Sequence, residues 1–277
     1  MNYRHAFHAG NHAEVLKHVL LLACLAHLAR KPAAFAVLDT HAGRGGYDLE
    51  SAEARRANEW REAAGRIWDS ADAPELVATY RAALAAANPD GALHFYPGSP
   101  LLIRAALREG DHLIACEMHP EDGAALKARF RGDAQAQIHA PRDGWEALRA
   151  LLPLQPRRGL VLIDPPYEEE GEVKKAARAL GEAVARFETA TFLWWRPLKD
   201  ARALDAADAE ARQYFTRPAL RADLAVATPQ KDGALAASSV LIVNPPFGLA
   251  ARAEAALAWL CARLKIGGGA AWRVQER

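Results

Sequence analysis

The sequence contains little cysteine and no long uninterrupted apolar run. Its 277 residues include three cysteines and no CxxC pair; they are Cys24, Cys116 and Cys261. Neither a disulfide framework nor a Cys-based zinc site is therefore expected. The longest apolar stretch near the start, residues 15–28, is interrupted by a lysine and two histidines and falls short of the ~18 apolar residues of a membrane span. No signal-peptide pattern precedes it. These absences predict a cytoplasmic protein with no membrane contact.

An excess of one charge sign is also missing. Lys and Arg number 35 against 34 Asp and Glu, so the formal net charge is +1. This balance argues against a polycation, but a local basic patch stays possible because clefts focus charge independently of the total. With 51% hydrophobic and 25% charged residues, the composition is that of a globular protein. A length above the usual ~100–200 residues predicts one large domain or a domain with an insertion.

Alternating patterns along the chain predict an α/β fold. A helix is expected from Asn11 or His12 to the Lys31-Pro32 step. Three apolar runs follow, at residues 35–39, 112–117 and 159–164, and each ends in a carboxylate. Strands alternating with helices form parallel doubly wound sheets, which bind ligands beyond the carboxyl ends of their strands.

Further elements are expected in the second half of the chain. Residues 191–196 are predicted to form a fifth strand, and residues 224–228 and 239–244 an antiparallel hairpin. A last helix is expected over residues 250–264, and Gly267 to Gly269 are interpreted as its C-cap.

The first two acid-ended strands are unusually far apart. In nucleoside-binding folds the acid of the second strand lies ~20 residues beyond the glycine loop, but here 78 residues (117 − 39) separate Asp39 from Glu117. Two helical patterns, over residues 50–68 and 74–87, occupy the excess. We therefore expect a single domain, residues 1–277, that carries a helical insertion at residues 48–95.

The most specific motif is Asp164-Pro165-Pro166-Tyr167, at the end of a predicted strand. Methyl transfer to an exocyclic amine requires a nitrogen lone pair that is otherwise delocalised into the ring. The Asp164 carboxylate and the Pro165 carbonyl would accept both N–H bonds and localise it, while two prolines fix the backbone. Tyr167 offers a flat face for an extruded base. The alternative is a Pro-Pro turn with an incidental aspartate.

A glycine-rich loop follows the first strand, with Asp39, His41, Gly43 and Gly45. Small residues there let backbone amides approach a nucleoside. The loop does not match GxGxxG, which disfavours a nicotinamide-dependent dehydrogenase. Glu117 is suited to accept hydrogen bonds from two ribose hydroxyls, although a strand-end acid facing water is an equally good interpretation from spacing alone.

A second Pro-Pro motif, Asn244-Pro-Pro-Phe247, follows another apolar run. If the last strand is antiparallel, its carboxyl end points away from the ligand face, ~15–20 Å from the chemistry for a strand of this length. A structural role is therefore expected for Asn244.

Histidines and cations gather in the first eighteen residues, with Arg4 and Lys17 among four histidines. Their spacing matches no common zinc ligand pattern, so no metal site is expected. We predict a segment that faces a substrate, with Arg4, His5 and Lys17 on phosphates and Tyr3 or Phe7 on a base. A helix cap with solvated polar residues is the alternative.

Taken in order, these pieces resemble one family. The Tyr3-Arg-His-x-Phe-His-Ala-Gly-Asn-His-Ala-x-Val-Leu-Lys-His18 segment is followed by Leu38-Asp-Thr-His-Ala-Gly-x-Gly45, by Tyr96-Pro-Gly-Ser99 and by Asp164-Pro-Pro-Tyr-Glu168. The chain is thereby similar to the RlmJ family, bacterial 23S rRNA (adenine-N6)-methyltransferases that modify adenine 2030. The N-terminal segment is far more specific than the DPPY motif.

The resemblance implies a class I S-adenosylmethionine-dependent methyltransferase: a Rossmann-like, mostly parallel seven-stranded sheet with an antiparallel last strand and a helical insertion. It implies Asp164 as the catalytic residue and Tyr3 near the substrate. Together with the motifs above, Tyr3, Arg4, His5, Lys17, Pro165 and Tyr167 are expected to bind substrate. The implied cofactor contacts are His18, His41, Ser99, Glu117, Asp143, Gly144 and Asp164.

Other functions of the same fold stay open at this point. The motif would also serve guanine-N2 methylation of rRNA, adenine-N6 methylation of DNA or methylation of a glutamine amide. A non-catalytic RNA-binding protein is disfavoured by the intact Asp164, Tyr167 and glycine loop. For a 23S rRNA enzyme with a net charge of +1, basic residues should concentrate around the N-terminal segment and the mouth of the site. A monomer is expected.

Overall fold

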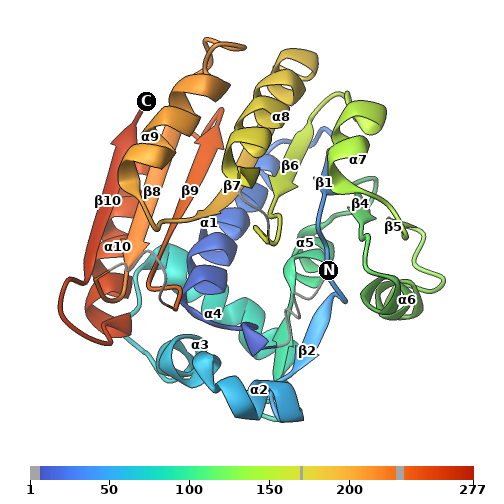
Figure 1. The fold of residues 1–277 in the computed structure, drawn as a ribbon. Helices are drawn as coiled ribbons and strands as arrows, with labels where there is room; N and C mark the ends of the chain where they lie inside the picture. The colour runs from blue at the N-terminus through green and yellow to red at the C-terminus, as the bar shows by residue number, and fades with distance from the viewer. Residues whose placement is uncertain (1–6, 169–170, 229–233) are drawn as a thin grey trace.

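The structure is a computed structural model that describes residues 7–168, 171–228 and 234–277 (Figure 1). Its centre is an eight-stranded sheet. Across that sheet the strands are β10 (Ala271–Glu276), β8 (Ala219–Ala225), β9 (Ala237–Val243), β7 (Thr191–Pro197), β6 (Gly159–Ile163), β1 (Ala36–Asp39), β4 (His112–Cys116) and β5 (Ala136–His139). The block from β7 to β5 is parallel, whereas β9 pairs antiparallel with both β7 and β8. The expected α/β fold with a mostly parallel sheet is confirmed.

The sheet has one strand more than the seven expected. Gly267 to Gly269 do not simply cap the last helix, because Gly269, at φ +78°, lies in the turn that leads into β10. β10 pairs antiparallel with β8 at the edge of the sheet. Most of its side chains are exposed, so the strand lacks the continuous apolar run by which a buried strand is found in a sequence.

Two helical layers cover the sheet. Alternate residues of a strand point to opposite faces: Leu160 and Leu162 of β6 pack in one core cluster, and Val161 and Ile163 in the other. The helices of the first cluster are α1 (His12–Ala29), α4 (Glu75–Ala87) and α10 (Leu249–Leu264), with α5 (Ser99–Ala106) beside them. Those of the second are α7 (Gly144–Leu151), α8 (Glu172–Arg186) and α9 (Ala201–Ala211), while α6 (Pro120–Arg129) packs beside β5.

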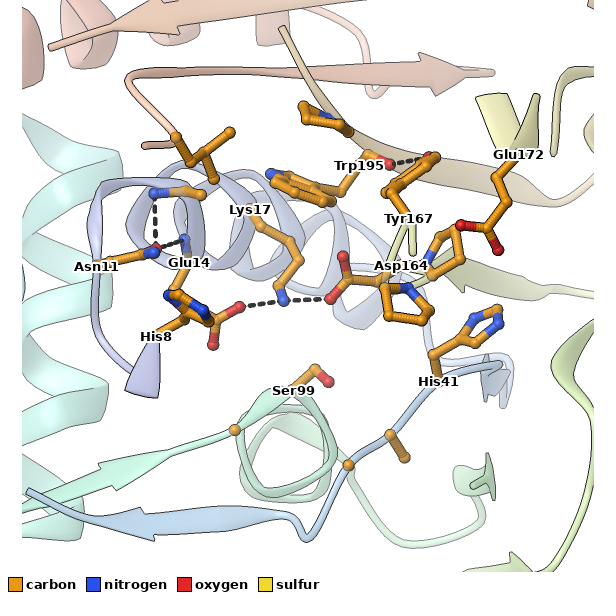
Figure 2. A pocket seen from close by; sticks show the side chains of 18 of the residues that line it. His8, Asn11, Glu14, Lys17, His41, Ser99, Asp164, Tyr167, Glu172 and Trp195 are labelled. Atoms are coloured by element: carbon orange, nitrogen blue, oxygen red, sulfur yellow. Dashed lines mark hydrogen bonds and ion pairs between the residues drawn. The ribbon is translucent and has the colours of Figure 1, made fainter. Parts of the chain in front are cut away.

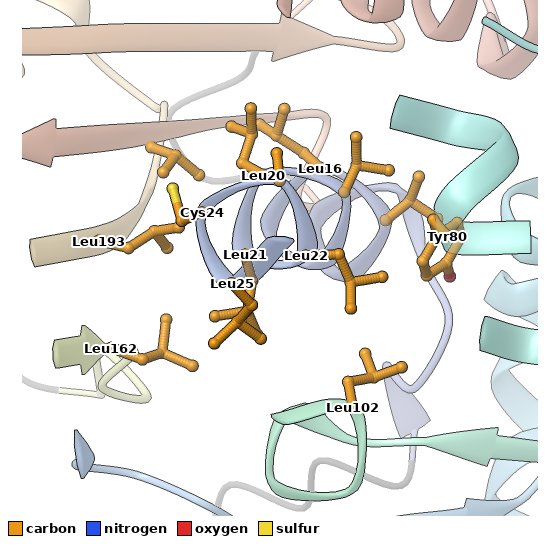
Figure 3. Packing of buried hydrophobic residues seen from close by; sticks show 14 of the residues in the cluster. Leu16, Leu20, Leu21, Leu22, Cys24, Leu25, Tyr80, Leu102, Leu162 and Leu193 are labelled. Atoms are coloured by element: carbon orange, nitrogen blue, oxygen red, sulfur yellow. The ribbon is translucent and has the colours of Figure 1, made fainter. Parts of the chain in front are cut away.

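Helix α1 lies at the centre of the first layer, where its leucines meet side chains from β6, β7, α4 and α5 (Figure 3). Asn11 caps it by accepting hydrogen bonds from the amides of Ala13 and Glu14. Helix α1 is long and apolar enough to cross a membrane, but 83% of this helix is buried inside the protein. Its apolar surface is thus used to bind the sheet to the helices around it.

The interval between β1 and β4 contains β2 (Gly46–Asp48), α2 (Ala52–Ala57), the 3-10 helix η2 (Glu59–Glu62), α3 (Ala64–Trp68), α4, β3 (Phe95–Pro97) and α5. The single helix predicted over residues 50–68 is wrong, because Asn58 at φ +57° ends α2 and the chain restarts. Tyr80 and Leu84 of α4 are fully buried in the first core cluster. The insertion that we propose for residues 48–95 therefore shares its core with the sheet.

Candidate functional site

A cavity of about 410 Å³ opens where the parallel strands end. His41 follows β1, Glu117 follows β4 and Asp164 follows β6, and all three line the cavity. The first turns of α1 close one side with Glu14 and Lys17 (Figure 2). The cavity thus lies at the carboxyl ends of the strands, as expected for a doubly wound sheet.

Asp164 is held by a lysine from α1. Its side chain is 12% exposed, and its Oδ2 accepts a hydrogen bond from the Lys17 ammonium, which also donates to Glu14 Oε1. Burial by itself lowers the pKa of Lys17, but the attraction of Asp164 and Glu14 outweighs burial and raises that pKa well above its usual value. Lys17 is therefore a permanent cation between two carboxylates.

This position argues against the expectation that Lys17 binds RNA phosphates, which stays a prediction. The side chain is 3% exposed and both of its partners lie inside the protein. Two of the three N–H donors of the ammonium are directed at these carboxylates, so Lys17 is poorly placed for a phosphate on the surface. Glu14 was missed in the sequence, although its place three residues before Lys17 on one helix puts both on the same face.

Tyr167 is fixed to the wall of the cavity by its hydroxyl. The hydroxyl donates to the Trp195 carbonyl oxygen at 2.7 Å and accepts from Trp194 Nε1 at 2.6 Å. Trp194 is fully buried in the core, whereas Trp195 lines the cavity with Tyr167. Pro165 and Pro166 line it too. Hydroxyl anchoring leaves the aromatic ring as the part of Tyr167 that a planar ligand can contact.

Glu117 ties the glycine loop to the end of β4. Its two carboxylate oxygens accept the amides of Gly43 and His119, each at 2.7 Å. The side chain is 8% exposed, and burial raises its pKa from the usual value. Each carboxylate oxygen has a second lone pair, so Glu117 can still accept hydrogen bonds from a pair of hydroxyls.

Beneath the loop, Ser99 at the start of α5 donates to Asp39 Oδ2 at 2.7 Å. Asp39 is completely buried, and within the described part of the chain its Oδ1 has no hydrogen-bond partner. Burial raises the pKa of Asp39 to about 7. Ser99 lines the cavity whereas Asp39 lies behind it.

His41, which follows β1, also lines the cavity. Its ring packs edge-on against Trp145, with the ring centroids 5.3 Å apart. Burial lowers its pKa to about 4, so the imidazole is neutral near pH 7. Gly144 packs so tightly behind His41 that an added Cβ would lie 2.7 Å from the ring. Asp143, the N-cap of α7, accepts the amide of Glu146.

Three of the expected cofactor contacts lie behind the wall of the cavity. Gly144 packs against His41, and neither Asp143 nor Gly144 is among the described residues that line the cavity. His18 is 0% exposed and does not line it either; its Nδ1 lies 2.8 Å from the Tyr96 hydroxyl, and its Nε2 lies 3.9 Å from Glu14 Oε2. In this conformation the three residues position groups that do face the cavity.

The expectations for Tyr3, Arg4 and His5 concern residues that lie outside the described part of the chain. His8 does line the cavity and contacts Glu59 of the insertion at 3.1 Å. Among the described residues no group of His, Cys, Asp and Glu side chains could hold a metal ion.

The second Pro-Pro motif, which begins at Asn244, lies away from the cavity and stabilises the fold. Asn244 adopts φ +53° after the antiparallel strand β9, and its amide donates to the carbonyl oxygens of Glu188 and Ala190. These hydrogen bonds join the end of β9 to the segment before β7, at the end of the sheet away from the cavity. The antiparallel direction of β9 predicted this location.

Among the described residues that line the cavity, carboxylates outnumber lysines. Its described lysines are Lys17 and Lys199, against the carboxylates of Glu14, Glu117, Asp122, Asp164 and Glu172. A cation is the complementary small ligand for such a lining.

The chain matches known proteins over almost its whole length. The sequence model of the family described as ribosomal RNA large subunit methyltransferase D, RlmJ, matches residues 32–275. Proteins named ribosomal RNA large subunit methyltransferase J are similar: that of Escherichia coli K12 is 37% identical (95% of this chain, 94% of that protein). That of Haemophilus influenzae is 36% identical (99% and 98%). A crystal structure of protein LPL1258 from Legionella pneumophila superposes with a TM-score of 0.88 and 29% identity, covering 97% of this chain and 98% of that one. The chain therefore belongs to the RlmJ family of ribosomal RNA large subunit methyltransferases.

Proposed function

We propose that this protein transfers a methyl group from S-adenosylmethionine to N6 of adenine 2030 in 23S rRNA. The observation that carries the proposal is the position of Asp164: it lies at the end of β6, lines the cavity beside Pro165 and Tyr167, and is held by Lys17. Membership of the family supports the rRNA substrate and the adenine target.

The described residues fit the cofactor. Glu117, buried at the end of β4, would bind the ribose hydroxyls. Gly43 is required in the loop because its φ is +61° and an added Cβ would lie 2.5 Å from the Tyr47 hydroxyl. His41 would flank the adenine end of the cofactor, supported by Asp143 and Gly144. The acidic lining suits a positively charged ligand. When bound there, S-adenosylmethionine supplies a methyl group on a sulfonium sulfur.

The residues of the Asp-Pro-Pro-Tyr motif would act on the target base. Asp164 and the Pro165 carbonyl accept the two N–H bonds of the amine, which turns the nitrogen lone pair out of the ring and toward the methyl group. Tyr167 stacks on the extruded adenine, because its hydroxyl already holds the ring against β7. Stacking of this kind contributes about 1–3 kcal/mol per base.

Lys17 would orient Asp164 and keep it ionised. Attack by N6 makes the amine acidic, so Asp164 does not need a raised pKa to take a hydrogen bond from it or to accept its proton late. Tyr3, Arg4 and His5 are proposed to contact RNA from the N-terminal segment. We further propose that the protein acts as a cytoplasmic monomer without membrane contact.

The test is to map tritiated methyl transfer from S-adenosylmethionine on naked 23S rRNA fragments and on assembled subunits. Incorporation should depend on the adenine at position 2030, and the product should be N6-methyladenine. Incorporation into a guanine or into duplex DNA would instead support one of the alternative substrates of this fold. Binding of RNA without any incorporation would support a non-catalytic role.

A further inference from the structure

The turn that precedes α1 contacts the 3-10 helix η2 of the proposed insertion. The Glu59 carboxylate of η2 lies 3.1 Å from His8 Nδ1 and accepts a hydrogen bond from Asn11 Nδ2 at 3.0 Å. Between these two residues, the Gly10 carbonyl oxygen accepts the amide of Ala64 at 3.1 Å. The start of α1 is therefore attached to the insertion by side-chain and backbone hydrogen bonds.

Glu59 determines which way the Asn11 amide points. An ionised carboxylate only accepts hydrogen bonds, so the nitrogen of the Asn11 side chain must face Glu59. Its oxygen then faces α1, where it accepts the amides of Ala13 and Glu14 at 3.0 Å each. Capping of this kind stabilises the first turn of a helix. Glu59 thus acts on the turn of α1 that carries Glu14, one turn before Lys17.

The contact between Glu59 and His8 depends on pH. The hydrogen bond to Glu59 raises the pKa of His8 above its ordinary value of 6.5 against the effect of burial, and the charges of Glu59 and Glu14 raise it further. The pair is therefore charged at pH 6 and loses the proton of His8 as pH rises through the raised pKa. His12 also faces Glu59, but burial lowers its pKa to about 4, so it stays neutral in this range.

Glu59 holds residues of the cavity wall and does not fill the core. Its side chain is 39% exposed and that of His8 is 40% exposed, and ion pairs at such exposure contribute little to global stability. The wall that this contact supports contains His8, Asn11, Glu14 and Lys17 (Figure 2).

We propose that Glu59 is a positioning residue for the RNA: it fixes the cavity wall at the start of α1, on which the ion pair of Lys17 with Asp164 depends. This step rests on the function proposed above, in which Asp164 receives the amine of the target adenine. Glu117 and His41, proposed for the cofactor, follow the strands β4 and β1 instead. Loss of the Glu59 charge should therefore weaken the use of RNA and spare the binding of S-adenosylhomocysteine.

The experiment compares kcat/KM for 23S rRNA fragments between the wild type and Glu59→Gln at pH 6 and pH 9. Glutamine keeps the size of the side chain and can accept from Asn11, but it has no charge for His8. At pH 6 kcat/KM should fall about threefold to fivefold, the upper range for a half-exposed ion pair. At pH 9, where His8 is neutral, the loss should be less than about twofold. Groups that titrate equally in both proteins cancel in this ratio.

The affinity for S-adenosylhomocysteine is measured by calorimetry at the same two pH values. It should stay within about twofold of the wild type in Glu59→Gln, as for a surface substitution away from the ligand.

The variant His8→Asn removes the titrating group but keeps an amide that can donate to Glu59. When Glu59→Gln is added to this variant, its effect should be the same at pH 6 and pH 9, because no imidazolium forms. The matched control is Glu62→Gln, which removes a carboxylate of the same 3-10 helix whose ion-pair partner, Arg66, lies within the insertion. It should leave kcat/KM and its pH dependence unchanged.

Three results would overturn the positioning role of Glu59 while the methyltransferase assignment stands. The first is a loss of kcat/KM in Glu59→Gln that is absent or equal at both pH values. The second is an equal loss of affinity for S-adenosylhomocysteine, which would mean that Glu59 supports the fold as a whole. The third is an effect of Glu62→Gln as large as that of Glu59→Gln.

Failure of the proposed function is recognised separately. If the wild type transfers no methyl group to RNA, hydrogen exchange of the Ala13 and Glu14 amides at pH 6 tests the contact alone. Exchange should be faster in Glu59→Gln than in the wild type, because the Asn11 cap is held less firmly. Equal exchange in the two proteins would overturn the role of Glu59 as well.

Discussion

Lys17 and Asp164 are 147 residues apart in the sequence and form a buried ion pair. The pair joins the first helix to the end of the central strand β6 and places the Asp-Pro-Pro-Tyr motif against α1. The geometry of the proposed catalytic site therefore depends on the docking of α1 in the core as well as on the motif itself.

The first prediction concerns Asp164→Asn. The amide keeps the size of the carboxylate but loses its charge, so it no longer accepts both a lysine and the target amine. We expect methyl transfer to fall by at least about a hundredfold, the scale for removal of a group that acts on the reacting atom. Binding of S-adenosylhomocysteine, measured by calorimetry, should change by less than about tenfold. Full residual activity would refute the assignment of Asp164.

The second prediction concerns Lys17→Met. Removal of the cation leaves two carboxylates buried side by side, and breaking a buried pair in this way costs about 3–5 kcal/mol. Urea unfolding at pH 8 should show a loss of this order. The salt dependence of RNA binding should not change, because Lys17 is buried. A weaker dependence of RNA affinity on salt in the variant would instead support a contact between Lys17 and an RNA phosphate.

The control for that variant is Lys199→Met, which removes an exposed lysine of the same cavity. Substitutions of this kind usually change stability by less than about 0.5 kcal/mol. A loss equal to that of Lys17→Met would mean that net charge, and not the ion pair with Asp164, explains the effect.

The sequence predicted the elements that carry strong local signals. Apolar runs that end in Asp39, Glu117 and Asp164 located three parallel strands, and the distance between the first two predicted the insertion that we propose. Strand β10 was not found because its exposed side chains carry no apolar pattern. The break of the first insert helix at Asn58 depends on a left-handed backbone, which asparagine adopts in only some contexts.

Within the site, the sequence predicted the positions of the acidic residues better than it predicted which side chains contact each other. Asp164 and Glu117 lie where strand ends put them. The burial of Lys17 between two carboxylates could not be read from the sequence, because Asp164 reaches α1 only through the packing of the whole sheet. His18 was expected at the cofactor but is buried against Tyr96, a contact across 78 residues of sequence that likewise depends on the fold.

The third prediction concerns the titration of Asp39. Its folded pKa of about 7 lies above the ordinary value of 3.8, so folding favours the protonated form. That contribution is fully present below pH 3.8 and is lost as pH rises to about 7. Relative to Asp39→Asn, which does not titrate there, the wild type should lose stability with rising pH in this window, by at most about 1.4 kcal/mol per pH unit.

The same titration is testable from Ser99. The hydrogen bond from Ser99 lowers the pKa of Asp39 against the effect of burial, so Ser99→Ala should raise it further. Carboxyl NMR resonances followed across pH would show the shift. An Asp39 resonance that titrates at the ordinary value in the wild type would contradict the burial of its ionised form.

The fourth prediction concerns Gly144→Ala. A Cβ at this position would lie 2.4 Å from the Thr40 carbonyl oxygen and 2.7 Å from the His41 ring, so the loop after β1 must move. Forced packing of this kind costs about 1–3 kcal/mol, and S-adenosylhomocysteine affinity should fall with the displacement of His41. Gly268→Ala is the control, because nothing lies within 4 Å of a Cβ there. Equal thermal stability of the two variants would argue against tight packing behind His41.

The fifth prediction separates the two roles of Tyr167. Tyr167→Phe keeps the ring but removes the acceptor of the fully buried Trp194 N–H and the donor to the Trp195 carbonyl. Leaving a buried group unsatisfied costs about 1–3 kcal/mol, so the free energy of unfolding should fall by this amount while kcat/KM for RNA stays within about tenfold.

Tyr167→Ala removes the ring as well, and with it the proposed stacking on the target adenine. The worth of one stacked base, about 1–3 kcal/mol, corresponds to a further loss of about tenfold to a hundredfold in kcat/KM. Because both variants lack the hydroxyl, the difference between them isolates the ring. If the Phe and Ala variants methylate RNA equally well, Tyr167 serves only to anchor the motif to β7, and the base must be held by another wall of the cavity.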